Sequence, residues 1–244
     1  MSSASKKKGE SVREFIKLNS WNIALALSIA LFILSILTNG FSFHSITGDA
    51  ILTTSKEGRV TLDLFVMSEC PYGVQAENIL GDVLKAFGKE INFNLYFIAN
   101  KVSDNEFQSL HGQTEVEEDI RQLCIIKNYP ETYYNYILCQ NKNIKARKDI
   151  SSTWQDCLIE NNMNVNKIRE CVDNEGGSLL SKNILKAEEL KVYGSPTLYI
   201  NGTKYQGART ASAFQNAICE IDNSLKGCSI NLNTTQAQAP NGSC

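Results

Sequence analysis

The spacing of apolar and polar side chains predicts a strand, a helix and a second strand early in the chain. Residues 60–67 form a mostly apolar run, and residues 71–87 repeat apolar side chains every three or four positions. The repeat predicts a helix, which Gly88 would end because glycine readily adopts the conformation found after helices. Residues 91–97 alternate between apolar and polar side chains, which predicts a strand. This order predicts parallel strands joined by a right-handed crossover.

From about residue 114 to residue 192 the spacing is helical. A capping box at residues 114–117 predicts one helix start, Pro130 suits a first helical turn, and Asn164 suits the cap of another helix. The glycine pair at residues 176–177 is expected to break the helical run. Together these signals predict an insertion of four helices of modest length.

The pattern returns to strand after the helical block. Residues 197–200 and 203–206 flank Asn201-Gly202, and this dipeptide between two strands predicts a tight hairpin. A last helix is expected to be capped near Thr210, with its apolar side chains on one face. The chain after Gly227 is polar, so we expect no further element there.

A segment near the start of the sequence predicts a membrane anchor. Residues 21–39 are strongly apolar and uncharged. The segment before them is basic, with Lys6, Lys7, Lys8, Arg13 and Lys17. A helix of this length can span a lipid bilayer, and the positive-inside rule keeps residues 1–20 in the cytoplasm. We favour a retained transmembrane anchor; a cleaved signal peptide and a buried helix are the alternatives.

The remainder of the chain divides into a linker, one domain and a tail. Residues 40–58 are polar and mixed, which suits a linker, and residues 59–226 form the expected domain with its helical insertion. Residues 227–244 form a flexible, polar tail. With a cytoplasmic N-terminal segment, the anchor would place all three parts outside the cytoplasm.

Composition favours an oxidising compartment. The chain has eight cysteines, more than a reducing cytosol usually holds without a metal site. No C-x-x-C or H-x-x-x-H spacing is present, and the two histidines are His44 and His111, so we expect no bound metal. The formal net charge of -2 gives no indication of a nucleic-acid partner.

The run Cys70-Pro71-Tyr72-Gly73 is the main candidate for chemistry, because it lies between the first strand and the first helix. Pro71 suits the first helical position, where the helix offers unpaired N–H groups and the positive end of its dipole. Both features favour a thiolate at Cys70, which makes the sulfur nucleophilic near neutral pH. The alternative is a buried, inert cysteine.

A second candidate, Ser195-Pro196, comes directly before the strand at residues 197–200. An active cysteine between strand and helix, followed later by a proline that is usually cis, is typical of the thioredoxin fold. Tyr72 and the Ser195-Pro196 loop would shape a shallow groove for an extended substrate backbone. Gly73 stands where a C-x-x-C motif has its second cysteine, so Cys70 is expected to act as a single active-site cysteine.

The order of these elements resembles the DsbA-like branch of the thioredoxin fold and, within it, gamma-interferon-inducible lysosomal thiol reductase (GILT) proteins. The resemblance covers about residues 60–224. It rests on Leu110-His111-Gly112, on the cysteines of the insertion, on the glycines at 176–177 and on the run 196–202. The chain departs from the family at Gly73 and in lacking the cysteines that flank the His-Gly element. The resemblance implies an α/β, thioredoxin-like (DsbA/GILT-like) fold and thiol–disulfide exchange without a cofactor.

Six cysteines are expected to form structural disulfides. They are Cys124, Cys139, Cys157, Cys171, Cys219 and Cys228. The four in the insertion allow three pairings, of which we favour the nested one, in which the outer two cysteines pair and the inner two pair. Cys219 and Cys228 suit a local disulfide. Cys70 and Cys244 then remain.

These observations predict a membrane-anchored, extracytoplasmic thiol–disulfide oxidoreductase or isomerase that acts on protein thiols and disulfides through Cys70. A mixed disulfide on Cys70 could be released by a second substrate thiol, by a small thiol, or by Cys244 as a resolving cysteine, and we favour the first two routes. His111 is expected to be structural rather than a general base. The alternative function is a degenerate thioredoxin-fold module that binds polypeptides in the same groove without redox turnover.

Overall fold

The computed structural model describes residues 60–104, 106–236, 238–240 and Cys244. The predicted anchor and linker lie outside these residues. Among the described residues, no helix combines the length and apolar character needed to cross a bilayer. The described residues all belong to one compact unit of the chain.

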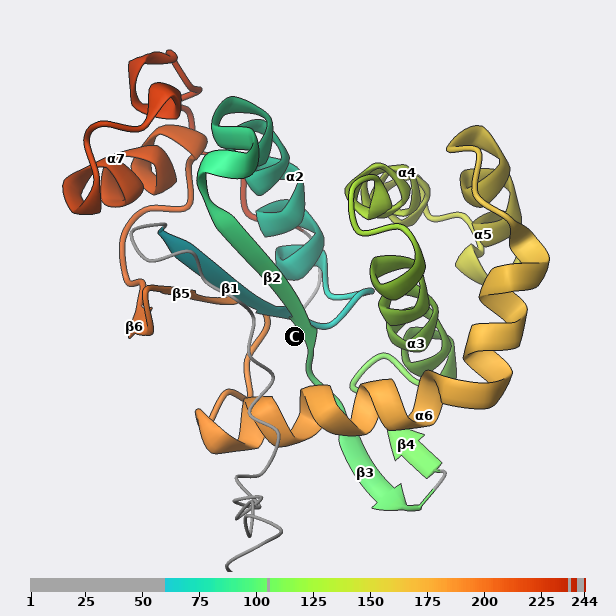
Figure 1. Cartoon of the computed structure of the whole chain (residues 1–244). Helices are drawn as coiled ribbons and strands as arrows, with labels where there is room; N and C mark the ends of the chain where they lie inside the picture. Colours follow the sequence, from blue (N-terminus) through green and yellow to red (C-terminus); the bar gives the residue numbers. More distant parts are fainter. Residues whose placement is uncertain (1–59, 105, 237, 241–243) are drawn as a thin grey trace, which may run out of the picture. The chain divides into compact units, whose positions relative to one another are not determined.

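A four-stranded sheet in the order β2-β1-β5-β6 forms the centre of the fold (Figure 1). β1 (Thr61–Val66) pairs in parallel with β2 (Asn92–Phe97) and antiparallel with β5 (Thr197–Ile200), which pairs antiparallel with β6 (Thr203–Lys204). The hairpin turns at Asn201-Gly202, where both residues have positive φ. The parallel pairing and this hairpin confirm the predictions.

Apolar side chains pack on both faces of the sheet. On one face, Leu64 of β1 packs in a large cluster with side chains of α2 (Pro71–Phe87) and α7 (Ala211–Ile221). Phe65, the next residue, belongs to a smaller cluster that also contains Cys70. Successive side chains of a strand point to opposite faces, which is why neighbouring residues of β1 enter different clusters. The candidate cysteine therefore lies against the sheet.

Between β2 and β5 the chain forms a short hairpin and four helices. The hairpin, which was not predicted, consists of β3 (Asn100–Ser103) and β4 (Glu106–Gln108). The helices of the insertion are α3 (Gln113–Asn128), α4 (Tyr133–Lys145), α5 (Ile150–Glu160) and α6 (Val165–Glu189). Figure 1 shows α3, α4 and α5 grouped together, with α6 running back past the end of β2. The insertion thus returns the chain to the sheet beside the candidate site.

Disulfides tie the helices of the insertion together. Cys124 of α3 pairs with Cys171 of α6, and Cys139 of α4 pairs with Cys157 of α5. This is the nested pairing. A third disulfide, Cys219–Cys228, joins α7 to the short 3-10 helix η2 (Lys226–Ser229), as expected for a local pair. A second 3-10 helix, η1 (Gly88–Glu90), follows α2.

Helix α6 runs without interruption through Gly176 and Gly177, so the predicted break was wrong. A Cβ atom on Gly176 would overlap the side chain of Ile120 on α3, and a Cβ on Gly177 would lie 3.4 Å from the ring of Phe107. The two glycines therefore let α3 and the β4 strand approach α6 closely. Packing of the insertion outweighs the intrinsic cost of glycine within a helix, about 1 kcal/mol for each residue.

Two of the predicted helix caps are present. The side chain of Asn164 accepts a hydrogen bond from Lys167 N (3.0 Å) at the start of α6. The side chain of Thr210 accepts one from Ala213 N (3.0 Å) at the start of α7. Each cap satisfies a backbone N–H that would otherwise have no partner within its helix.

Two other predicted helix starts were wrong. The capping box at residues 114–117 lies inside α3, whose cap is Gly112 with a φ of 97°. Pro130 lies in the turn before α4 rather than in its first turn. Within α3, the side chain of Glu115 accepts a hydrogen bond from Glu69 N, in the segment before Cys70. That long-range contact was not part of the local pattern.

The described part of the polar tail is hydrogen-bonded to the domain. The side-chain amide of Gln215 on α7 donates to the carbonyl oxygens of Gly227 and Ile230, each at 2.6 Å. Ser212 N donates to the carbonyl oxygen of Asn233 (3.0 Å). These bonds hold the first part of the tail against α7.

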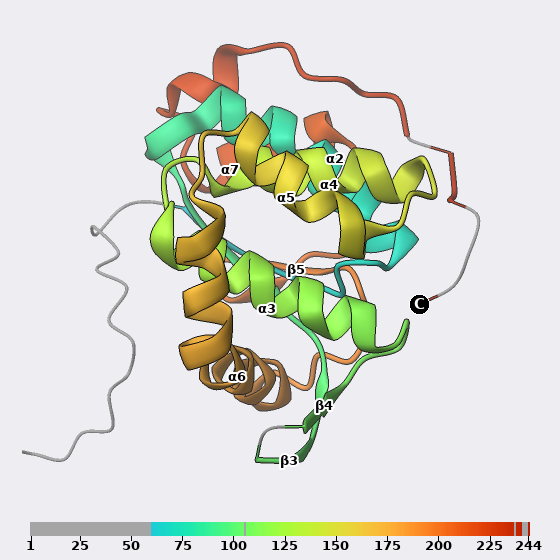
Figure 2. The same ribbon diagram turned by 90° about the vertical axis from the view of Figure 1, so that its right-hand side faces the viewer.

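Further along, the tail reaches α2. The side-chain amide of Gln75, in the first turns of this helix, donates to the carbonyl oxygen of Gln238 (2.6 Å). Figure 2 shows the segment after η2 passing from α7 to the side of the domain where Cys244 lies. This path carries Cys244 to the N-terminal end of α2.

Candidate active site

Cys70 is the N-cap of α2. Its backbone is extended (φ -63°, ψ 120°), Pro71 follows at the first helical position, and Gly73 N donates to Cys70 Sγ over 3.3 Å. The predicted position of the cysteine at a helix start is therefore confirmed. A sulfur in this position receives an N–H bond and faces the positive end of the helix dipole, and both stabilise a thiolate.

The Ser195-Pro196 loop lies directly against Cys70, and its Ser195–Pro196 peptide bond is cis, as predicted. Cys70 Sγ lies 3.5 Å from the carbonyl oxygen of Ser195. The hydroxyl of Ser195 accepts a hydrogen bond from Met67 N (3.0 Å), at the end of the segment that leads to the cysteine. Chain segments 128 residues apart are thereby joined at the site.

Gly73 has little room for a side chain. A Cβ atom there would lie 2.7 Å from Ser195 Oγ and 3.1 Å from the carbonyl oxygen of Met67. The space that a second cysteine of a C-x-x-C motif would enter is thus filled by the serine hydroxyl of the cis-proline loop. Gly73 and Ser195 are complementary in size.

Cys70 is not a lone cysteine. It forms a disulfide with Cys244, 174 residues further along the chain, with a Cα–Cα distance of 5.7 Å. This corrects the prediction of a single active-site cysteine. The sequence suggested a flexible tail, whereas hydrogen bonds from α7 and α2 direct the tail to the site. Cys70 is wholly buried, whereas Cys244 is exposed.

Aromatic side chains pack in the cluster that contains Cys70. Tyr72 packs against the cluster that contains Cys70 and Phe65, and the ring of Phe65 stacks on that of Tyr96 at 4.8 Å. Tyr193, just before the cis-proline loop, is 72% exposed. Tyr72 packs against the cluster of Cys70, and the Ser195-Pro196 loop lies beside its sulfur, as the groove hypothesis requires.

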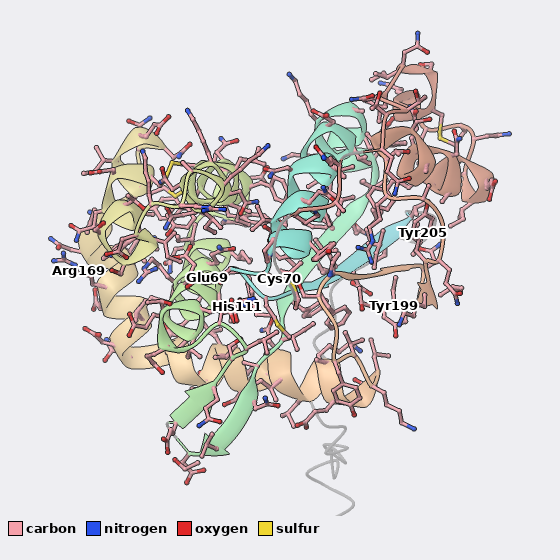
Figure 3. The ribbon with its side chains drawn as sticks, turned by 180° about the vertical axis from the view of Figure 1, so that it is seen from behind. Glu69, Cys70, His111, Arg169, Tyr199 and Tyr205 are labelled. Atoms are coloured by element: carbon pink, nitrogen blue, oxygen red, sulfur yellow. A yellow bond between two sulfur atoms is a disulfide. The ribbon has the colours of Figure 1, made fainter. Side chains whose placement is uncertain are left out.

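Buried carboxylates hold the segment that precedes Cys70. Asp119 Oδ1 accepts from Ser68 N (3.1 Å), and Glu115 Oε1 accepts from Glu69 N (2.9 Å). His111 Nδ1 lies 2.8 Å from Glu115 Oε1, and Figure 3 shows His111 and Glu69 close to Cys70. The contact of His111 with Glu115 suits the structural role expected for this histidine.

The surroundings of these carboxyl groups alter their ionisation. Burial, followed by repulsion from Glu115, raises the pKa of Asp119 well above its ordinary value. Burial also raises the pKa of Glu69. On α2 itself, burial raises the pKa of Glu77 to about 8, against the opposing effect of a hydrogen bond from Asn141. Such groups stay protonated at pH values where ordinary carboxyl groups are charged.

The described residues of the site form no metal centre. Within the described ranges, no group of three or more His, Cys, Asp or Glu side chains is arranged to hold a metal ion. All eight cysteines are in disulfides, so no thiolate is available as a ligand in this form. The chemistry that the arrangement supports is exchange at sulfur.

Comparison with known proteins agrees with this geometry. The sequence model of the family described as gamma interferon inducible lysosomal thiol reductase (GILT) matches residues 61–161, which include β1, Cys70 and most of the insertion. Over these residues the chain is similar to the GILT family. A search of curated protein sequences finds no match.

Solved structures show the same fold. Reduced DsbA from Mycobacterium tuberculosis superposes with a TM-score of 0.52 and 16% identity, covering 69% of this chain and 85% of that one. Oxidised BdbD from Bacillus subtilis superposes with a TM-score of 0.52 and 14% identity, covering 68% of this chain and 89% of that one. The reduced disulfide bond oxidoreductase DsbG from Mycobacterium tuberculosis superposes with a TM-score of 0.50 and 16% identity, covering 66% of this chain and 77% of that one. These likenesses establish the DsbA-like thioredoxin fold.

Within this DsbA-like fold, the predicted site residues separate into two groups. Those at the site are Cys70, Pro71, Tyr72, Gly73, Ser195, Pro196 and Cys244. The other six cysteines form disulfides elsewhere. Sequence reasoning missed Glu115 and Asp119, although His111, Glu115 and Asp119 recur every four residues. The spacing of Glu115 and Asp119 places both on one face of α3, and it was the signal that could have found them.

Proposed function

We propose that this chain is a membrane-anchored, extracytoplasmic thiol–disulfide oxidoreductase that acts on protein thiols or disulfides. The observation that carries the proposal is the position of Cys70. Its sulfur caps α2, receives the Gly73 N–H bond and faces the cis-proline loop. An inert core cysteine has no need of a helix N-terminus, whereas a reactive one gains a stabilised thiolate from it.

The Cys70–Cys244 disulfide supports exchange by a pair of cysteines. Gly73 provides no neighbouring thiol, and Cys244 supplies one from the tail. In the dithiol form, one thiolate attacks a substrate disulfide and displaces one substrate thiolate, which leaves a mixed disulfide. The other cysteine then closes the Cys70–Cys244 bond and releases the second substrate thiolate. Two electrons pass from the protein to the substrate, and reversal of the steps oxidises a substrate dithiol.

The surface around the site suits an extended polypeptide. Tyr72 and the Ser195-Pro196 loop border Cys70, and Tyr193 beside the loop is exposed. Aromatic side chains and a loop backbone offer apolar contacts and hydrogen bonds to a substrate chain without selecting one sequence. This composition favours protein substrates over a small molecule held in a closed cavity.

The extracytoplasmic location rests on residues 1–39 and on the disulfides. The apolar segment at residues 21–39 and the basic residues before it support a retained anchor with the domain outside the cytoplasm. Four disulfides, two of them within the insertion, suit a compartment that is not kept reducing.

The test is the catalysed reduction of protein disulfides, with insulin as substrate and glutathione as electron donor. We expect the double variant Cys70→Ser, Cys244→Ser, which removes both cysteines of the pair, to lower the rate to that of the uncatalysed reaction. The control is the double variant Cys139→Ser, Cys157→Ser, which removes a disulfide between α4 and α5, outside the site, and should keep the activity. Full activity in the variant without Cys70 and Cys244 would overturn the proposal, since the exchange would then not depend on the pair. A wild type without exchange activity would favour a polypeptide-binding module without redox turnover.

A further inference from the structure

The two sulfurs of the Cys70–Cys244 disulfide differ in access. Cys70 has no exposed surface, and its sulfur lies 3.3 Å from Gly73 N and 3.5 Å from the Ser195 carbonyl oxygen. Cys244 is exposed. A thiolate must approach the sulfur that it attacks along the line of the S–S bond, from the side opposite the leaving sulfur. For Cys70 that approach is obstructed by the protein, whereas Cys244 is an exposed residue.

The two sulfurs also differ as leaving groups. When the bond breaks toward Cys70, the resulting thiolate keeps the Gly73 N–H bond at the start of α2. No such donor to Cys244 occurs among the described residues. Disulfide exchange is faster when the departing thiolate is the more stable one. Access and leaving-group stability therefore select the same sulfur for attack.

The geometry points to Cys244 as the residue that carries the substrate, with Cys70 as the buried leaving group. This inference rests on the proposed function and assigns the order of its steps. A substrate thiolate attacks Cys244 Sγ, the S–S bond breaks, and its electron pair leaves on Cys70. The product is a substrate–Cys244 mixed disulfide together with a Cys70 thiolate.

The second step consumes this intermediate. A second substrate thiolate attacks the substrate sulfur of the mixed disulfide, which forms the substrate disulfide and leaves the electron pair on Cys244. In the reducing direction the Cys244 thiolate attacks the substrate disulfide first, and the Cys70 thiolate then attacks Cys244 Sγ. The intermediate on Cys244 is the same in both directions. The roles are the reverse of those expected from the sequence, where Cys70 was to attack and carry the substrate.

The hydrogen bonds of the tail keep Cys244 close to Cys70. Gln75 of α2 binds the Gln238 carbonyl, and Gln215 and Ser212 of α7 bind the tail before it. Cys244 lies six positions beyond Gln238, and a chain of that length spans at most about 20 Å. Cys244 therefore remains within reach of the Cys70 thiolate after the bond opens.

The test uses the full chain in its disulfide form, with glutathione as a single-thiol probe. The reaction is stopped at low conversion with N-ethylmaleimide, and the peptides are identified by mass without reduction. We expect glutathione on Cys244 and maleimide on Cys70, with the opposite pattern on the order of tenfold rarer, as the difference in leaving group requires. The Cys124–Cys171 peptide, which should stay disulfide-bonded, is the internal control.

Each other outcome has a distinct meaning. Glutathione on Cys70 with maleimide on Cys244 overturns the assigned order while leaving thiol–disulfide exchange intact. Equal amounts of the two adducts also overturn it. If neither glutathione nor a reduced protein substrate opens the Cys70–Cys244 disulfide, the proposed function itself fails, and the order of steps fails with it.

Discussion

The hydroxyl of Ser195 has two structural roles. It accepts the Met67 N–H bond, and the same atom occupies the space beside Gly73. The absence of a side chain at position 73 and the presence of a hydroxyl at position 195 are therefore coupled. A protein with this pair has no room for a cysteine three residues after Cys70, and its second sulfur comes from elsewhere in the chain.

This coupling predicts that Gly73→Ala lowers the free energy of unfolding by about 1–3 kcal/mol, since the new Cβ is forced against Ser195 Oγ. Gly81→Ala on the same helix is the control, because its Cβ would meet Leu138 at an ordinary 3.4 Å. Ser195→Ala alone removes the partner of Met67 N and should cost about 1–3 kcal/mol.

The double variant Gly73→Ala, Ser195→Ala should lose less stability than the sum of the two single losses. Urea unfolding of all four variants measures this. Strict additivity, or a harmless Gly73→Ala, would show that the serine hydroxyl does not fill the space.

Glu77 predicts a pH dependence of stability. Its pKa rises from 4.5 to about 8 in the folded protein, mainly through burial. Between these values the folded state keeps a proton that the unfolded state releases, so stability falls as pH rises through this window. The slope from one such group is at most about 1.4 kcal/mol per pH unit. Above pH 8 the loss is complete.

We therefore expect Glu77→Gln to flatten the fall of unfolding free energy with pH and to be most stabilising, relative to the wild type, near pH 8. The measurement is urea unfolding at a series of pH values. Glu117→Gln, at an exposed position of α3, is the control and should follow the wild type. An unchanged slope in Glu77→Gln would mean that this carboxyl group is charged in the folded protein.

Some residues of the site could be predicted from the sequence and others could not. Cys70 and Ser195-Pro196 could be found because their neighbours specify a strand end, a helix start and a loop. Glu115 and Asp119 could not be assigned, because their partners are the backbone N–H groups of Glu69 and Ser68, more than 40 residues away. A contact of that kind depends on how α3 packs, and no local pattern specifies it.

At the scale of elements, the sequence predicted helices and turns correctly where residues close together in the chain determine them. The bounds of α2, the caps at Asn164 and Thr210, and the hairpin at Asn201-Gly202 follow from residues within a few positions of each other. The prediction at Gly176-Gly177 was wrong because the local tendency of glycine competed with packing against α3. Tertiary contact decided that case.

The disulfides of the insertion predict a definite order of stability. Cys124 and Cys171 are 47 residues apart, whereas Cys139 and Cys157 are 18 apart. The disulfide that closes the longer loop restricts the unfolded chain more. Removing Cys124–Cys171 should therefore lower the free energy of unfolding by about 4 kcal/mol, and removing Cys139–Cys157 by about 3 kcal/mol.

The comparison is urea unfolding, without reductant, of the wild type and of two double Cys→Ala variants. We expect the variant without Cys124–Cys171 to unfold at the lower urea concentration. The reverse order would mean that packing around each disulfide in the folded state, rather than loop length, determines its contribution to stability.

At the scale of the whole molecule, the chain joins distant segments of its sequence through sulfur. The sheet and α2 hold Cys70, the insertion covers the segment before it, and the tail brings Cys244 to it across α7. The fold class was predictable because each element has a local signature. The Cys70–Cys244 pairing was open in the sequence, since it depends on the path of a polar segment that has no periodic pattern.

The remaining prediction concerns the membrane. Residues 21–39 are uncharged and apolar, and the basic residues lie before them, so the segment should hold the domain outside the cytoplasm. In intact cells, added protease should remove the domain and leave a short protected N-terminal fragment, detected through a tag at the start of the chain. A cytoplasmic protein should stay intact, and a known extracytoplasmic protein should be digested. Complete protection of the domain while that second control is digested would contradict the extracytoplasmic location, and with it the oxidising environment in which the Cys70–Cys244 pair is proposed to work.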